Sequence, residues 1–354
     1  MQKFLVFLCP FLRLYLIGDI FMKKILAVIA AVLSVAIILV ACTNSKSNNN
    51  STTKNNDDKS KISIVTTIFP EYDWVKQILG ENQANVELTM LLDNGVDLHS
   101  YQPSADDMVK MSKCDLFIYV GGESDAWVDD ALKSAQNKNM KVINLLDVLG
   151  NSVKEEEQVE GMQAEEEEEE GEEEAPEYDE HVWLSLKNAK TLCSSIADAL
   201  CEIDSKNEDV YKKNLNEYTK NLDALDKEYQ QVVNSAKYDT LVFGDRFPFR
   251  YMVDDYSLKY YAAFVGCSAE TEASFETIKF LANKVDELGV RTVLTIENPK
   301  HKIAQTVVEN TKEKNQKILA LNSMQSVTSN DVKNGETYLN VMQSNLDVLK
   351  QALN

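Results

Sequence analysis

Two blocks of short apolar runs, each interleaved with helical segments, most constrain the fold of this 354-residue chain. The runs are ISIVTTI (62–68), NVELTMLL (85–92), DLFIYVG (115–121) and KVINLL (141–146) in the first block, and TLVFG (240–244), YYAAFVG (260–266), RTVLTIE (291–297) and KILALN (317–322) in the second. Because the runs do not alternate with polar residues, they suit strands buried on both faces, and the intervening helices favour parallel sheets. The sequence predicts two α/β lobes, at 61–205 and 237–354.

A regular apolar stripe lies between the two blocks. Its members, at spacings of four and three, are Tyr211, Leu215, Tyr218, Leu222, Leu225, Tyr229 and Val232. Such a stripe is typical of the packing face of a long helix. The predicted fold is therefore α/β, with two Rossmann-like lobes joined by one long spanning helix over 206–236. A coiled-coil dimer is the alternative, but the repeat stops abruptly against α/β sequence, and we expect a monomer.

The N-terminal region has the order of a secretory signal. A basic start at 22–24 precedes an uncharged, almost wholly apolar run over 25–41. The run ends in LVAC, which resembles the lipobox of bacterial lipoproteins and implies cleavage before Cys42 and a lipid on its sulfur. We therefore expect an extension plus lipoprotein signal peptide over 1–42 and a polar, flexible tether over 43–60. A plain transmembrane anchor is the alternative.

The acidity of the chain is local. Residues 154–180 hold sixteen acidic residues and one lysine, which accounts for −15 of the net charge of −21. A segment of this composition cannot bury a core, so 154–178 is predicted to be an exposed, disordered acidic loop within the first lobe. A weak metal-gathering role is the alternative. Nothing basic is concentrated enough to bind phosphates, which excludes nucleic acid as a partner.

Two of the three histidines fall where α/β proteins bind ligands. His99 lies in DLHSYQPSADDM, where Ser104 and Asp107 match a capping box and predict a helix that begins after Pro103. This places His99 in a loop after a strand, at the edge where open α/β sheets place ligands. His181 occupies a similar loop-to-helix transition before VWLSLKNAKTL.

The cysteines beyond the signal segment do not indicate a metal site. They stand at positions 114, 193, 201 and 267, without Cys-x-x-Cys spacing. They are predicted to be buried thiols, and a thiolate metal site is not expected.

Two segments carry a resemblance to a known family. DLHSYQPSADDM and YDEHVWLSLKNA resemble the metal-binding segments of the zinc and manganese solute-binding lipoproteins of ABC importers, which have the forms His-x-Tyr/Phe-x-Pro-Ser and Asp-x-His-Val-Trp-Leu-Ser-Pro. GGESDAWVDDAL (121–132) is similar to the family's Gly-Gly…Trp segment. The resemblance covers the chain after the signal segment. It implies that His99 and His181 are metal ligands and that the charged loop before the second histidine is a family feature.

The resemblance leaves the remaining ligands less well matched. The family's third ligand follows the first strand of the second lobe, where this chain reads FGDRFPFRYM. Arg246 stands at the strict register, so the resemblance implies Asp245 as the ligand, or alternatively an Asp245 paired with an arginine. The fourth position, in NSMQS (322–326), has no carboxylate, and Glu297 is the substitute, with a structural role as the alternative.

The expected function follows from these ligands. Two imidazoles and one or two carboxylates suit Zn²⁺, whereas more oxygen ligands would favour Mn²⁺. We expect an extracytoplasmic receptor, anchored to the membrane by lipid on Cys42, that delivers the metal to an ABC transporter permease. A surface adhesin lipoprotein is the alternative. An enzyme is not expected, because the chain has no His-Glu-x-x-His motif and no nucleophile motif with a partnered histidine.

Overall fold

The structure of the chain, a computed structural model, describes residues 61–163, 177–268, 272–297 and 300–354. Ser60–Asn354 forms one compact unit. The predicted signal segment, the tether and Cys42 lie outside the described residues, as do positions 164–176 of the predicted acidic loop. No helix in the described ranges combines the length and the apolar character needed to cross a membrane.

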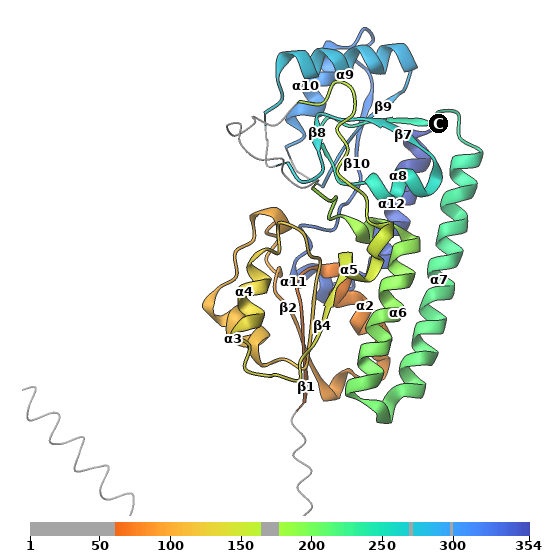
Figure 1. The fold of residues 1–354 in the computed structure, drawn as a ribbon. Coiled ribbons are helices and arrows are strands. Elements are labelled where there is room, and N and C mark those ends of the chain that lie inside the picture. Colours follow the sequence, from red (N-terminus) through yellow and green to blue (C-terminus); the bar gives the residue numbers. More distant parts are fainter. Residues whose placement is uncertain (1–60, 164–176, 269–271, 298–299) are drawn as a thin grey trace, which may run out of the picture. The chain divides into compact units, whose positions relative to one another are not determined.

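The first lobe is built on a four-stranded parallel sheet (Figure 1). Its strands, in the spatial order β2-β1-β3-β4, are β1 (Ile62–Thr66), β2 (Val86–Met90), β3 (Leu116–Tyr119) and β4 (Lys141–Asn144). Its helices are α2 (Phe69–Leu79), α3 (Ala105–Lys113), α4 (Trp127–Lys133), α5 (Leu145–Leu149) and α6 (Leu186–Ile203). Each predicted apolar run of the first block contains one strand. The predicted capping box is also present, because Ser104 Oγ accepts the Asp107 N–H and the Asp107 carboxylate accepts the Ser104 N–H.

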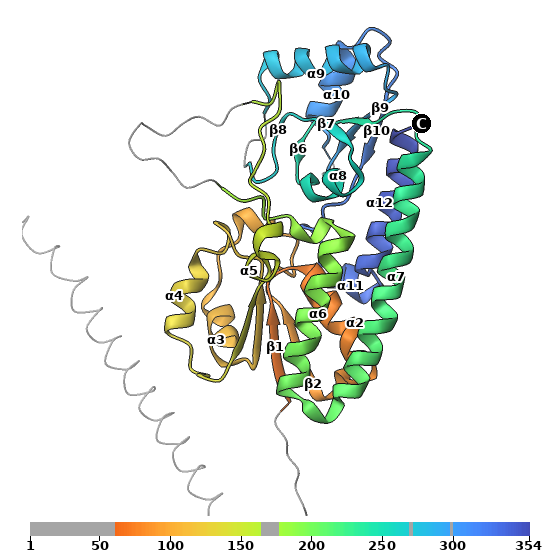
Figure 2. The same cartoon turned by 45° about the vertical axis from the view of Figure 1, so that its right-hand side comes forward.

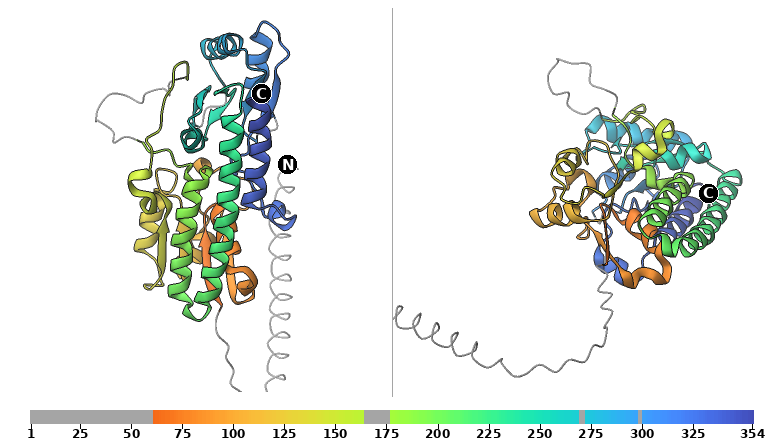
Figure 3. Two further views of the ribbon diagram at one scale, coloured as in Figure 1. Left: turned by 90° about the vertical axis from the view of Figure 1, so that its right-hand side faces the viewer. Right: turned by 60° about the horizontal axis from the view of Figure 1, so that its bottom comes forward.

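The predicted spanning helix is α7 (Glu208–Asn234), 27 residues long. Its apolar stripe packs against α2 and α6 of the first lobe and against α12 (Tyr338–Ala352) of the second. Figures 2 and 3 show α7 running beside both lobes, with α12 alongside it. At its C-terminal end, the buried Tyr229 hydroxyl donates to the Met342 carbonyl at 2.7 Å. The prediction of two α/β lobes joined by a long helix is thus confirmed.

The second lobe is assembled from short parallel strand pairs. The pairs are β5 (Thr240–Val242) with β7 (Lys259–Tyr261), β6 (Arg246–Phe247) with β8 (Phe264–Val265), and β9 (Thr292–Thr295) with β10 (Lys317–Ala320). Its remaining helices are α8 (Arg250–Tyr256), α9 (Phe275–Leu288), α10 (Lys302–Asn310) and α11 (Ser329–Lys333). The predicted strand over 260–266 divides into β7 and β8, because the Ala263 N–H turns to the Asp245 carbonyl. At this point the chain stops pairing with β5, through β7, and begins to pair with β6, through β8.

The start of the predicted acidic loop differs from the expectation. Residues 154–163, which we call the docked strap, lie against the second lobe. The Lys154 N–H donates to the Tyr251 hydroxyl at 3.1 Å, and the Gln163 N–H donates to the Ala263 carbonyl at 2.9 Å. Composition predicted a solvated segment. Instead, backbone groups and acidic side chains of the strap bond to the second lobe; for example, Glu157 of the strap pairs with Arg250 at 3.0 Å.

Candidate metal centre

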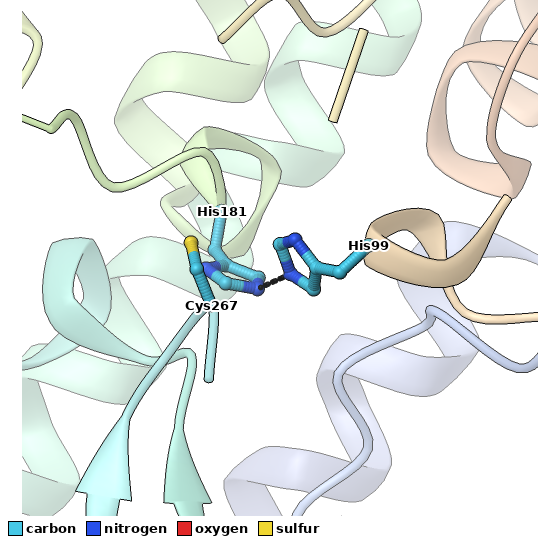
Figure 4. A group of neighbouring side chains, drawn as sticks. All are labelled: His99, His181 and Cys267. Atoms are coloured by element: carbon cyan, nitrogen blue, oxygen red, sulfur yellow. Dashed lines mark hydrogen bonds between the residues drawn. The ribbon is translucent and has the colours of Figure 1, made fainter. Parts of the chain in front are cut away.

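The structure brings the two predicted histidines together between the lobes. His99 lies in a short 3₁₀ helix (Leu98–Ser100) after β2, and His181 directly precedes another (Val182–Leu184) that leads into α6. Their Nε2 atoms lie 3.1 Å apart (Figure 4). Two nitrogens bound tetrahedrally to one Zn²⁺ at about 2.0–2.1 Å would be about 3.3 Å apart. The pair is therefore spaced to share one ion.

Asp179 orients His181. Its Oδ1 accepts the imidazole Nδ1–H at 3.0 Å and the His181 backbone N–H at 2.8 Å. The Asp179 carbonyl in turn accepts the Tyr251 hydroxyl at 2.8 Å, which fixes this segment against the second lobe. Because Nδ1 is engaged, Nε2 is the nitrogen left for a metal. The residue two positions before the histidine therefore acts as an orienting carboxylate.

Ser124 is the hydrogen-bond partner of His99, and Glu180 holds Ser124 in place. His99 Nδ1 lies 2.8 Å from Ser124 Oγ and 3.5 Å from Glu180 Oε2, while Glu180 Oε1 accepts the Ser124 N–H at 2.9 Å. Gly122, with φ +78°, permits this arrangement, because a Cβ there would lie 2.3 Å from the Glu180 carboxylate. Adjacent acids of the DEH segment thus serve different histidines. Sequence reasoning gave neither acid a role, although their position beside His181 was the available signal.

His99 is held in the protonation state that binds metals. Burial, with smaller contributions from the neighbouring His181 and the Arg246 guanidinium, lowers the pKa of His99 to about 3, although Asp97 opposes the shift. The His99 imidazole is therefore neutral near neutral pH, which is the form of histidine that binds metals, so metal binding does not first require loss of the imidazolium proton.

Asp245 and Arg246, which follow the first strand of the second lobe, have other partners. The Asp245 carboxylate accepts the Arg246 N–H at 3.0 Å and the Ile296 N–H at 3.4 Å. The Arg246 guanidinium pairs with the Asp97 carboxylate of the first lobe. Asp245 lies outside the group of potential ligand atoms found around the two histidines in the described part of the chain.

Glu297 is bonded to the loop after the last strand. One carboxylate oxygen accepts the Ser323 N–H at 2.7 Å, and the other accepts the hydroxyls of Ser323 at 2.8 Å and Ser326 at 3.1 Å. Gln325, in the same loop, contacts Asp97 and His181. In the orientation set by its neighbours, its amide donates to both Asp97 oxygens, and its oxygen lies 3.0 Å from His181 Nε2. Glu297 thus fixes a loop that faces the histidines.

Cys267 joins the two histidines, which the sequence did not predict. Potential ligand atoms of His99, His181 and Cys267 all lie within 4.8 Å of one another, and Figure 4 shows the cysteine beside the His181 ring. Burial raises the pKa of the Cys267 thiol, and Glu156 raises it further. The only sequence signal was its position just after an apolar run, at the carboxyl end of a parallel strand, where α/β proteins gather ligands.

An acidic cleft leads to this group of three residues. It has a volume of about 270 Å³, and its lining includes His99, Cys267 and three glutamates, Glu123, Glu177 and Glu180, whereas His181 is fully buried. A cleft lined by one sign of charge concentrates ions of the opposite sign. The arrangement can admit a cation and present imidazole and sulfur ligands to it.

Two α/β lobes, a long helix along both and a histidine pair between them define a solute-binding protein fold. Comparison with known proteins gives the family: the model for the periplasmic component A of the zinc-uptake complex, ZnuA, matches residues 64–352. The chain belongs to this family, which confirms the resemblance noted in its sequence.

Individual relatives are similar over most of the chain. The zinc-binding lipoprotein AdcA of Streptococcus pneumoniae is 34% identical, over 82% of this chain and 56% of AdcA, so the chain spans about half the length of that relative. The high-affinity zinc uptake system protein ZnuA of Bacillus subtilis is 30% identical, over 83% of this chain and 88% of ZnuA.

Solved structures show the same fold. The crystal structure of the Zn(II)-bound ZnuA-like domain of S. pneumoniae AdcA matches with a TM-score of 0.64 and 29% identity, over 83% of this chain and 99% of that domain. The laminin-binding protein Lmb of Streptococcus agalactiae, described as bifunctional with adhesin and metal-transporting activity, matches with a TM-score of 0.66 and 25% identity, over 83% of this chain and all (100%) of Lmb. These relatives are known as binding, transport and adhesion proteins rather than as enzymes.

Proposed function

We propose that this protein is an extracytoplasmic, lipid-anchored solute-binding protein that captures a divalent transition metal, zinc, and delivers it to an ABC importer permease. The observation that carries the proposal is the 3.1 Å distance between the Nε2 atoms of His99 and His181. Each ring has its Nδ1 engaged by neighbouring polar groups, so Nε2 is the nitrogen that would bind an ion, in place of its present contacts with the other ring and, for His181, with the Gln325 oxygen. Zinc-binding and zinc-uptake relatives support zinc as the captured ion.

Zinc is favoured over manganese by the donors present. Imidazole nitrogen binds Zn²⁺ more strongly than Mn²⁺, whereas oxygen-rich sites suit Mn²⁺. His99 and His181 supply two nitrogens, while Asp245 and Glu297 have other hydrogen-bond partners. Asp245 and Glu297 remain predicted metal ligands. A manganese-binding receptor of the same type remains the alternative to a zinc receptor.

Metal titration tests the proposal. Purified protein is stripped of metal and titrated with Zn²⁺ and Mn²⁺, and the titration is repeated with His99→Ala and His181→Ala. Each substitution removes one of two shared ligands, so we expect zinc affinity to fall by more than the 10–100-fold typical of losing an outer-shell partner. Asp245→Ala and Glu297→Ala, measured in parallel, show whether either carboxylate binds the ion.

His301→Ala is the matched control. The His301 ring bonds Thr295 Oγ1 at 2.7 Å, and His301 is not in the group formed by His99, His181 and Cys267. This variant should bind zinc as the wild type does. Unchanged zinc affinity in both His99→Ala and His181→Ala would overturn the proposal, and tighter binding of Mn²⁺ than of Zn²⁺ would select the manganese alternative.

The anchor and the permease are part of the same proposal. Lipid on Cys42 would hold a monomer at the outer face of the cell membrane, beside the permease that accepts the ion. Release of a Cys42→Ala variant into the medium, with the wild type retained in the membrane fraction, is the expected result. Equal retention of both proteins would contradict the lipid anchor.

Adhesion is a second candidate, favoured by one observation. The structural neighbour Lmb is described as both adhesin and metal transporter. Binding of the purified protein to immobilised laminin tests this role, and metal-stripped protein in the same assay shows whether adhesion depends on the metal. Absence of laminin binding in both forms would remove this candidate.

A further inference from the structure

We propose that the thiolate of Cys267 is the third protein ligand of the captured metal, so that the site is a His₂Cys site selective for zinc over manganese. The inference deepens the proposed function and rests on it. Its basis is geometric: potential ligand atoms of Cys267, His99 and His181 lie within 4.8 Å of one another, at the end of a cleft that both Cys267 and His99 line.

The backbone around Cys267 is built against the histidine. A Cβ on Gly266 would lie 3.1 Å from both Cε1 and Nδ1 of the His181 ring, so glycine permits the close approach of this strand end. The Cys267 N–H donates to Glu156 Oε1 of the docked strap at 2.9 Å. The hydrogen bond to Glu156 thus fixes Cys267, and the glycine before it allows the strand end to come close to the imidazole.

The strand order explains why the second lobe contributes sulfur from this position. Arg246, on β6, is a cation and pairs with Asp97, so it cannot bind a metal ion there. The neighbour of β6 is β8, which runs parallel to it, with Phe247 opposite Val265. Parallel neighbours end at the same edge of a sheet, so Cys267, two residues after the end of β8, reaches the site that Arg246 does not serve.

The chemistry of the donor set decides the metal. Coordination forms a Zn–S bond, and the thiol proton passes to bulk water, because the thiolate is the ligand. Thiolate with imidazole is a common zinc donor set, with Zn–S distances of about 2.3 Å. Thiolate is a soft ligand that selects against Mn²⁺, which prefers oxygen. Together with two neutral imidazoles, the thiolate offers one negative charge to the dication.

The first experiment detects the sulfur directly. Co²⁺ replaces Zn²⁺ in purified protein, and absorption is recorded for the wild type, Cys267→Ser and the matched control Cys201→Ser, whose sulfur lies near the Glu208 carbonyl. We expect a thiolate-to-cobalt charge-transfer band in the wild type and the control and its loss in Cys267→Ser. X-ray absorption on zinc-loaded wild type should show one sulfur at about 2.3 Å. This measurement needs no variant and so does not depend on the folding of Cys267→Ser.

The second experiment measures selectivity. Cys267→Ser should bind Zn²⁺ at least about tenfold more weakly than the wild type, since losing an outer-shell partner alone typically costs that much. Binding of Mn²⁺ should change less, so the preference for zinc over manganese falls. Absence of a sulfur scatterer in zinc-loaded wild type, or wild-type zinc affinity in Cys267→Ser, would overturn the inference.

These outcomes are separable from failure of the proposed function. If zinc binding depends on His99 and His181 but not on Cys267, the receptor proposal stands and the thiolate ligand is rejected. If the wild type binds no zinc, both fail together.

Discussion

At the residue scale, the site depends on carboxylates that do not themselves belong to the group of potential ligands. Asp179 orients His181 directly, whereas Glu180 acts on His99 through Ser124, whose N–H it accepts. Such partners fix the tautomer and the direction of the ligand nitrogen. The two adjacent acids point to different partners: Asp179 Oδ1 accepts from His181, and Glu180 Oε1 accepts the Ser124 N–H.

Asp125, in the turn that carries Ser124, predicts a pH dependence of stability. Its Oδ2 accepts the N–H groups of Val120 and Gly121, whereas its buried Oδ1 has no hydrogen-bond partner among the described residues. Burial raises the pKa of Asp125 to about 7, and Glu180 contributes to the rise. Between the unfolded pKa near 4 and the folded pKa, the folded protein holds a proton that the unfolded chain releases.

The sign follows from this proton difference. Because the folded state binds more protons in this window, the free energy of unfolding of the metal-free protein should fall as pH rises from about 4 to about 7, by about 1.4 kcal/mol per unit of pKa shift. Asp125→Asn should flatten this dependence, measured by denaturant unfolding at several pH values. Asp129→Asn, which removes an exposed carboxylate from the same segment, is the control. An unchanged pH dependence in Asp125→Asn would contradict the prediction.

At the scale of elements, the docked strap changes the interpretation of the acidic segment. Composition alone suggests that deleting 155–176 should leave tight metal binding nearly intact. The structure divides this segment, because Glu156 in the strap accepts the Cys267 N–H, and Gln163 at its end bonds the second lobe. Only 164–176 lies outside the described residues.

Two deletions test this division. Removing 164–176 should leave zinc affinity near that of the wild type. Removing 155–176 should weaken zinc affinity by about tenfold, the lower end of the range for loss of an outer-shell partner, because the Cys267 N–H loses its hydrogen-bond partner.

Two point variants form a matched pair for the same test. Glu156→Gln changes the partner of Cys267, whereas Glu160→Gln changes an exposed residue that forms only a loose ion pair with Lys284 at 3.9 Å. Equal zinc affinity for the two deletions would contradict a role for the strap.

At the scale of the whole folded unit, several contacts tie the two lobes. Helix α7 packs on both of them, the Trp183 Nε1–H donates to the Ser323 carbonyl at 2.8 Å, and the Tyr338 hydroxyl donates to the Trp183 carbonyl at 2.7 Å. A wide hinge motion would break buried hydrogen bonds and expose apolar surface of α7. We therefore expect metal binding to cause only a modest closure of the lobes.

Small-angle X-ray scattering of the metal-free and zinc-loaded protein measures this closure. The two profiles should be nearly superimposable at low angle, with a small decrease in the radius of gyration on binding. A rotation of the lobes by tens of degrees would contradict the prediction. His181→Ala with added zinc controls for nonspecific effects of the ion.

Much of the architecture was readable from local pattern. The apolar runs, the capping box at Ser104 and the stripe of α7 depend on residues close in sequence, whose spacing matches the geometry of a strand or helix. His99 and His181 were predictable because each sits in a long motif. The division of the run over 260–266 into β7 and β8 was not, because it depends on a hydrogen bond from Ala263 to Asp245, in the connection between β5 and β6.

The sequence by itself thus determined the α/β class, the spanning helix and two candidate ligands. Only the tertiary structure decided which other residues meet them: Cys267 comes beside His181, whereas Asp245 and Glu297 turn to backbone and hydroxyl donors. The physical reason is that a metal site is a point at which distant segments converge. Which side chain reaches that point depends on strand pairing, as of β6 with β8, and on the absence of a side chain at Gly266, neither of which is encoded in local spacing.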